Sequence, residues 1–205
     1  MRKIVLVLAM VAMVGAVSAQ ELSLGVKGGL NISNLSGKGV DDAKMKLGFH
    51  VGLGADYEFA PNMAVQSGLL FTTKGAKAKE LGVEGTLDMM YLQLPVHFAY
   101  KMDINPGTRF VLHAGPYVAY GVGGKTKFEE KGVSLSFDTF GKRKIGGVEV
   151  EGAKRFDAGL GIGAGFEFGQ FLVDLGWDMG LVNVGRDKDN KITTQNGYLS
   201  LGYKF

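Results

Sequence analysis

Apolar and non-apolar residues alternate strictly along much of the chain, which is the pattern of a β-strand with one apolar face. The segment 46–59 shows it most clearly, because apolar residues from Leu47 to Phe59 occupy every odd position. The even positions carry lysine, glycine, histidine, aspartate and glutamate. An average strand of a soluble protein has only about 5–6 residues. The pattern therefore predicts an unusually long strand.

The same alternation predicts further strands at 90–101, 109–122, 156–168, 171–181 and 199–205. It is less regular at 22–30 and at 63–73, where Ser67 and Leu70 fall on the wrong faces. Short links at 60–62, 102–108 and 169–170 alternate with long polar links at 31–45, 74–88, 123–155 and 183–196. Eight strands connected in this way predict an all-β fold, an antiparallel up-and-down barrel.

The composition of the two faces indicates a barrel in a membrane. A soluble barrel of the lipocalin kind would need a charged outer face, but here the non-apolar face is mostly glycine with isolated charges. Aromatic residues gather at the ends of the apolar face, with aliphatic residues between them, as in a transmembrane barrel. The girdle predicted at the short-turn end consists of Tyr57, Phe59, Phe98, Tyr100, Phe110, Phe166, Phe168, Phe171, Tyr203 and Phe205.

The first residues have the features of an export signal. Arg2 and Lys3 precede an apolar run from Ile4 to Val17, and small residues lead to Ala19. We interpret 1–19 as a cleaved signal peptide and 20–205 as the mature domain, since the run is short for a membrane anchor, which is the alternative. An exported barrel is expected in the outer membrane of a Gram-negative cell, with both ends of the mature chain in the periplasm.

Composition narrows the function. The 205 residues include no cysteine, which excludes disulfides and thiol chemistry. Without Arg2 and Lys3, 21 basic residues face 20 acidic ones, a balance that gives no support for nucleic-acid binding.

Several short motifs resemble the PorT-like family of outer-membrane β-barrel proteins from Bacteroidota-type bacteria. They are the segments 25–31, 91–96, 114–117, 156–159 and 199–205. The resemblance implies a multi-pass barrel in the cell envelope and, through the family's namesake, an accessory role in protein secretion. It also implies that Tyr203 and Phe205 form the signal read by the barrel-assembly machinery.

The alternation places a mixed set of polar side chains in the lumen. Eight strands leave an interior that side chains just fill, so we expect these groups to pair and close the barrel. A narrow conducting path is the alternative. The predicted lumen residues are Lys27, Lys46, His50, Asp56, Glu58, Gln66, His97, Lys101, Arg109, His113, Tyr117, Asp157, Glu167, Asp174, Asp178 and Lys204.

The three histidines suggest a metal site, but the pattern supports it weakly. If Lys101 pairs with Arg109 across the turn, His97 lies opposite His113, close enough to share a metal. His50 is expected at another height, and no carboxylate is placed as a third ligand. No long loop carries a histidine to act as a base, and the glycines at 159–165 alternate as a strand. We therefore predict no metal, no cofactor and no catalytic residue.

The link 123–155 is basic, with lysines at 125, 127, 131, 142, 144 and 154. It is either a solvated loop or a contact surface for anionic lipopolysaccharide or a protein partner. Within it, 133–140 alternates and is expected to extend the barrel above the membrane. The sequence predicts a non-enzymatic structural or interaction protein of the envelope, with a secretion accessory and a porin-like pore for small solutes as alternatives.

Overall fold

The computed structural model describes residues 22–37, 43–80, 83–130, 133–145, 148–185 and 190–205. The predicted signal peptide, 1–19, lies outside these ranges. Within them, no helix is long and apolar enough to cross a membrane. The described strands are β1 (Leu22–Gly37), β2 (Lys46–Ala60), β3 (Met63–Glu80), β4 (Val83–Asn105), β5 (Thr108–Gly123), β6 (Lys125–Glu130), β7 (Val133–Asp138), β8 (Lys142–Ile145), β9 (Val148–Glu151), β10 (Phe156–Phe168), β11 (Phe171–Gly180) and β12 (Ile192–Lys204).

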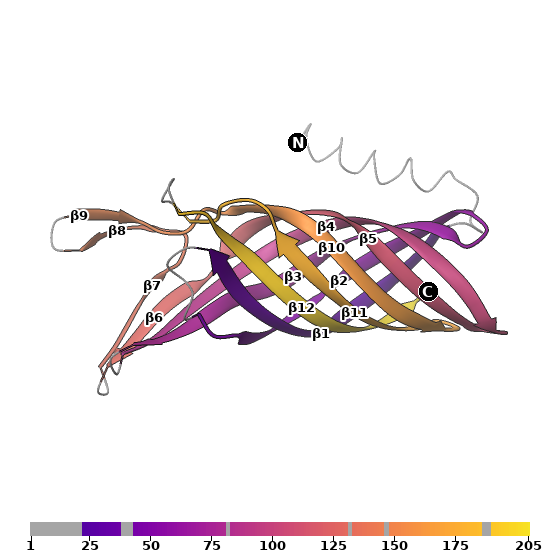
Figure 1. Cartoon of the computed structure of the whole chain (residues 1–205), viewed down its shortest axis with the longest axis horizontal. Coiled ribbons are helices and arrows are strands. Elements are labelled where there is room, and N and C mark those ends of the chain that lie inside the picture. Colours follow the sequence, from indigo (N-terminus) through magenta and orange to yellow (C-terminus); the bar gives the residue numbers. More distant parts are fainter. Residues whose placement is uncertain (1–21, 38–42, 81–82, 131–132, 146–147, 186–189) are drawn as a thin grey trace.

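Eight of these strands form a closed antiparallel ring in the order β1-β2-β3-β4-β5-β10-β11-β12 (Figure 1). The ring closes where β1 pairs with β12, from Gly25 opposite Lys204 to Gly37 opposite Ile192. Closure removes the free edges that an open sheet would expose, so every strand of the ring has two partners. The predicted eight-stranded up-and-down barrel is confirmed.

Tight turns close one end of the barrel, which we call the short-turn end. Asn62, Gly107 and Gly169 each adopt a positive φ, of 66°, 80° and 57°. Glycine and asparagine tolerate this backbone conformation better than other residues, which is why they occupy these turns. The predicted short links are confirmed in place, although β4 runs on to Asn105 and leaves only two residues before β5.

Several strands extend beyond their predicted ends at the opposite end, which we call the long-loop end. The link expected at 74–88 is instead a hairpin in which Lys74 lies opposite Met89 and Glu80 opposite Val83. Strand β1 continues into the link expected at 31–45 as far as Gly37, and β12 begins at Ile192 within the link expected at 183–196. These corrections share a cause: outside lipid a strand needs no continuous apolar face, so its alternation becomes harder to recognise.

The link 123–155 is also more ordered than expected. Strands β6 and β7 continue the sheet from the outer half of β4, and β8 pairs with β9 in a separate hairpin (Figure 1). Within 133–140, the alternating segment forms β7, which pairs with β6 at the edge of this sheet. Strand β4 has 23 residues, and its first part, Glu84 to Leu87, pairs with β6 beyond the ring.

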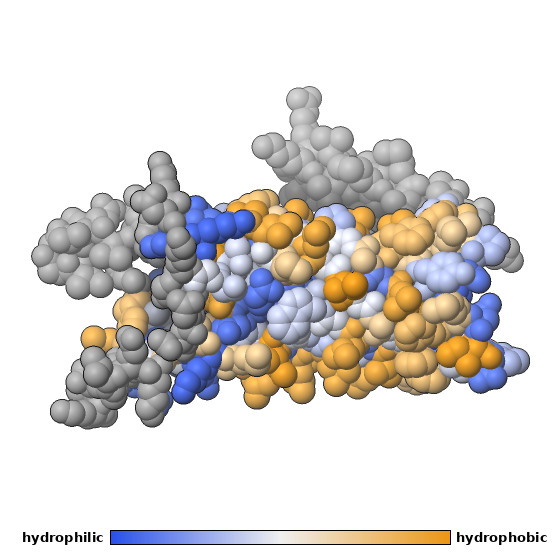
Figure 2. Space-filling view, in the orientation of Figure 1, coloured by the Kyte–Doolittle hydropathy of each residue, from blue (hydrophilic) through white to orange (hydrophobic). Residues whose placement is uncertain are grey.

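The strands of the ring expose many large apolar side chains, and Figure 2 shows those of one face. The girdle aromatics Phe59, Phe98, Phe171 and Phe205 are all exposed at the short-turn end. Rings from neighbouring strands touch there, such as Phe59 with Phe98 at 6.1 Å between centroids and Phe171 with Tyr203 at 5.4 Å. The interior contains mostly polar buried groups, so the barrel is apolar outside and polar inside.

Candidate functional site: the barrel lumen

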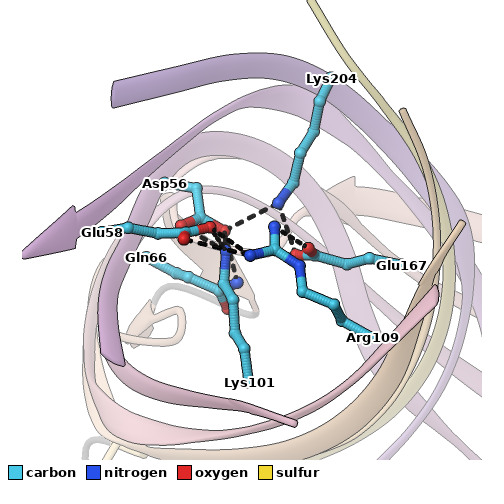
Figure 3. A network of polar contacts seen from close by, with 7 residues as sticks. All are labelled: Asp56, Glu58, Gln66, Lys101, Arg109, Glu167 and Lys204. Atoms are coloured by element: carbon cyan, nitrogen blue, oxygen red, sulfur yellow. Dashed lines mark hydrogen bonds and ion pairs between the residues drawn. The ribbon is translucent and has the colours of Figure 1, made fainter. Parts of the chain in front are cut away.

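A cluster of charges fills the lumen at the short-turn end (Figure 3). We call it the ionic plug; its members are Asp56, Glu58, Gln66, Lys101, Arg109, Glu167 and Lys204. They come from β2, β3, β4, β5, β10 and β12, so most of the ring contributes. All seven were predicted to face the lumen, and the alternation of their strands puts them there.

Three carboxylates and three cations pair completely within the ionic plug. The Lys101 ammonium, which is fully buried, lies 2.8 Å from Asp56 and 2.6 Å from Glu58. Arg109 bridges Glu58 at 2.9 Å and Glu167 at 2.7 Å, with one guanidinium nitrogen on each. Lys204 joins Asp56 to Glu167. Buried charges are tolerated only when they are paired in this way, so the plug is a neutral unit.

A stacked pair of histidines crosses the middle of the lumen. The rings of His97 and His113 lie 5.1 Å apart, with their Nδ1 atoms at 2.9 Å, and Nε2 of His113 contacts Asp174 at 2.9 Å. The expected register was wrong by two residues, because Ala99, and not His97, is the cross-strand partner of His113. The rings still meet because a diagonal neighbour on the same face is within reach of a long side chain.

The third histidine has a different environment, as expected. His50 contacts Asn31 through Nδ1 at 2.8 Å and Ser200 through Nε2 at 2.7 Å. Both ring nitrogens are therefore used by neutral partners. Within the described ranges, no group of three or more histidine, aspartate, glutamate or cysteine side chains is arranged to hold a metal ion.

The long-loop end of the lumen is closed by aromatic rings around one ion pair. Lys74 and Asp157 are both fully buried and 3.3 Å apart, and the Lys74 ammonium lies 4.4 Å from the centre of the Tyr117 ring. Above them Phe140, from the segment between β7 and β8, packs edge-to-face on Tyr91 at 5.7 Å. We call this cluster the aromatic plug; its buried apolar members are Met89, Tyr91, Tyr117, Ala119 and Phe140.

Glycines on β10 make room for the rings of the lumen. A Cβ added at Gly161 would lie 2.8 Å from the His97 ring, and one added at Gly163 would lie 2.5 Å from the His113 ring. Gly159 faces the Tyr117 ring in the same way. The glycine run predicted to be lumen packing therefore has a specific role: each of these three glycines accommodates one ring from β4 or β5.

Two cavities between the plugs are lined by residues that the structure describes. The lower cavity, about 70 Å³, lies beside the ionic plug and is lined by Lys27, Gly54, Asp174 and Lys204 among others. The upper cavity, about 20 Å³, is lined by Lys27, Gln93, His97, Asp178 and Asn196 among others. A single water needs about 10–15 Å³, so the upper cavity has room for one small molecule or ion.

The sequence analysis missed several lumen residues. Asn31, Lys74 and Asn196 are buried and form part of the lumen, yet all three fell in links expected to be loops. The signal was present in the alternation itself, since Leu30 and Ile32 flank Asn31 as exposed apolar neighbours. Lys46, which was predicted, pairs at the mouth with Asp88, which was not.

A closed antiparallel ring with an apolar outer band and a polar, charged lumen defines an integral outer-membrane β-barrel. The chain belongs to the outer membrane protein beta-barrel domain family, whose model matches residues 18–185. The protein is therefore located in the outer membrane.

The chain is also similar to solved structures of small barrels. The attachment invasion locus protein Ail of Yersinia pestis is 19% identical over 91% of this chain and 100% of that one, with a TM-score of 0.44. The outer membrane protein OprG from Pseudomonas aeruginosa is 15% identical over 89% and 95%, with a TM-score of 0.48. Neisserial surface protein A is 14% identical over 90% and 98%, with a TM-score of 0.46. The comparison with curated proteins gives no match.

Proposed function

We propose that the protein is a non-enzymatic, non-conducting barrel that anchors an interaction surface in the outer membrane. The observation that carries this proposal is the closure of the lumen at both ends. The ionic plug pairs three carboxylates with three cations, and the aromatic plug buries Tyr91, Tyr117 and Phe140. Eight-stranded barrels are filled by side chains, whereas open pores have about 16 strands. A solute would have to break buried ion pairs to pass.

Single-channel recording in planar bilayers tests the closure. The purified protein should give no discrete current steps in 1 M KCl, while a wide porin reconstituted in parallel shows that insertion is detected. Reproducible steps that scale with KCl concentration would contradict the proposal and favour a small-solute pore.

The sheet beyond the ring supports the interaction role. Phe128 on β6 and Leu135 on β7 are direct cross-strand partners, and they remain 41% and 65% exposed. Neighbouring exposed apolar side chains on a projecting sheet give a partner protein apolar area to bury. This hairpin lies at the long-loop end, where a protein partner of the envelope would reach it; a component of a secretion apparatus is the alternative.

Co-purification tests this surface. We expect a stoichiometric protein captured with the wild-type barrel to be lost when Phe128→Ser and Leu135→Ser are combined. The matched control is Leu201→Ser, which changes an exposed apolar residue on the outer wall of the ring. Loss of the partner with the control as well would indicate damage to the barrel and not a contact through the hairpin.

Contact with lipopolysaccharide is a second candidate, favoured by the exposed Lys125 and Lys127 on one face of β6. Attraction between such lysines and anionic headgroups is electrostatic and weakens with salt. The variant Lys125→Gln/Lys127→Gln should bind lipopolysaccharide micelles less well than wild type at low salt. Lys191→Gln, another exposed lysine, is the control, and unchanged binding by the double variant would contradict this candidate.

A further inference from the structure

Most charged side chains of the lumen pair with an opposite charge among the described residues. The ionic plug pairs three carboxylates with three cations, Lys74 pairs with Asp157, and Lys46 pairs with Asp88. The middle layer holds Asp174 and Asp178 but a single ammonium, that of Lys27. When the histidines are uncharged, this layer has one negative charge more than it has positive charges, and a proton on His113, which contacts Asp174, would remove that difference.

Hydrogen bonds fix the orientation of the histidine pair. An ionised carboxylate only accepts, so His113 donates from Nε2 to Asp174. In the uncharged form of His113 the Nδ1 atom is an acceptor, so His97 donates to it from its own Nδ1. In that form Nε2 of His97 carries a lone pair, whereas a proton on His113 would reverse the direction of this hydrogen bond. That nitrogen is buried and has no hydrogen-bond partner among the described residues.

A second carboxylate fixes the amide of Gln93 in the same way. Its Nε2 donates to Asp178 at 2.9 Å, so Oε1 points elsewhere as an acceptor. Oε1 is buried and unpartnered among the described residues, as is Oδ1 of Asn196. Gln93, His97, Asp178 and Asn196 are each more than nine-tenths buried, and all line the upper cavity. Three residues that line the cavity therefore each carry one buried atom without a hydrogen-bond partner among the described residues, and Lys27 bonds to none of these three atoms.

We propose that the upper cavity binds one small monovalent cation, with ammonium favoured over Na⁺ and K⁺. A buried acceptor without a donor is costly, so several together require an occupant that donates. The candidates differ in the number of hydrogen-bond donors and in charge. A proton on His97 would supply one N–H donor, and a water molecule would supply two O–H donors without charge. Ammonium supplies four N–H donors together with a positive charge. The imidazole nitrogen favours ammonium, because Na⁺ and K⁺ are hard cations that prefer oxygen ligands. This inference does not rest on the proposed function.

The test uses the full barrel refolded into detergent micelles in 0.3 M NaCl, KCl or NH₄Cl at pH 7, so that each cation has access during folding. The probe is the Nε2 resonance of His97, recorded by nitrogen NMR during titration at constant ionic strength. We expect a saturable shift with ammonium that equal Na⁺ or K⁺ does not produce. A saturable response to K⁺ or Na⁺ alone supports a cation site and overturns the ammonium preference.

Variants of two aspartates sharpen the test. Asp178→Asn removes a charged acceptor of the cavity and should weaken ammonium binding about 10-fold or more, as expected for a hydrogen bond to a charged group. Asp88→Asn, at the mouth, should change it less than about 2-fold, since that residue does not line the cavity. If Asp178→Asn does not fold, the salt comparison on the wild-type barrel decides alone. Three outcomes overturn the proposal: no saturable shift with any of the cations, an equal and unsaturable shift with all, or a His97 Nε2 that is protonated at pH 7.

Discussion

The two ends of the lumen are closed by different kinds of interaction. The ionic plug at the short-turn end relies on charges that share partners: Glu167 alone contacts Lys101, Arg109 and Lys204. The aromatic plug at the long-loop end relies on ring packing, with Phe140 held between Tyr91 and the guanidinium of Arg155. Removing any one charge leaves the ionic plug with a net charge, whereas removing one ring from the aromatic plug loses only the contacts of that ring.

This difference predicts where a substitution destabilises the barrel most. In a shared network, deleting one carboxylate leaves a buried cation uncompensated, and the cost exceeds the value of any single contact. In a packed cluster, deleting a ring costs approximately the apolar area that it buried. The short-turn end should therefore dominate stability, although both ends block the lumen.

The largest effect is expected for Glu167→Gln, which leaves three cations and two carboxylates in the ionic plug. We expect a loss of about 3–5 kcal/mol in the free energy of unfolding. Urea unfolding in lipid vesicles measures it, with the fluorescence of Trp177, the only tryptophan, as the signal. Glu129→Gln on the exposed face of β6 is the control and should leave stability unchanged.

Phe140→Ala should come next, with a loss of about 1.5–3 kcal/mol from the burial of one phenyl ring. The same unfolding experiment measures it, and Phe128→Ala, at a ring already 41% exposed, is the matched control. If Phe140→Ala cost more than Glu167→Gln, the ranking of the two plugs would be reversed.

Gly163→Ala tests the layer between the plugs. Its added methyl group would lie 2.5 Å from the His113 ring, so the ring must move and the 2.9 Å contact with His97 must lengthen. Overpacking of this kind costs about 1–3 kcal/mol, and the shift should appear in the histidine side-chain NMR spectrum. Gly54→Ala is the control, since its methyl group would approach nothing closer than 3.8 Å. Equal effects of the two substitutions would show that the histidine pair needs no glycine behind it.

The smallest effect is expected for Asp88→Asn, which breaks the partly exposed pair with Lys46 at the mouth. Such a pair contributes at most about 1 kcal/mol and is screened by salt. The loss should therefore vanish in 1 M NaCl, while that of Glu167→Gln persists because the plug is buried. If Asp88→Asn lowered the free energy of unfolding equally at low and high salt, the pair with Lys46 would behave like the buried ion pairs, and this prediction would be wrong.

The alternation in the sequence was sufficient to predict which face each strand turns to the lumen. The face of the sheet to which a side chain points depends only on its position along the strand and alternates from residue to residue. The alternation therefore correctly predicted that Lys101, Glu167 and Asp174 lie in the interior. Strand ends were harder to predict, because beyond the lipid the apolar face is no longer required and Lys74 resembles a loop residue.

Register and long-range contacts were not accessible from local pattern. Strand β4 runs on to Asn105 and leaves a turn of two residues, so Asp103 lies opposite Arg109, and the assumed pairing of Lys101 with Arg109 was wrong by two residues. Phe140 reaches the mouth from the far side of a hairpin, and no neighbouring residue signals that position. The barrel fold could therefore be predicted from the sequence. For the groups that close the lumen, the sequence indicated which residues face inward but not which of them contact one another.

The seam between β1 and β12 has a consequence for the order of assembly. Each of the other seven pairings joins a ring strand to the ring strand that comes next in the sequence. Strands β1 and β12, in contrast, bring together Gly25 and Lys204, which lie at opposite ends of the described chain. Contacts of such high sequence separation form late, since they close the longest loop. Lys204 lies on the last strand, and its partners Asp56 and Glu167 lie on β2 and β10, on either side of the seam. The bridge from Lys204 thus acts as a latch: only a ring that has closed in the correct register can complete its charge network.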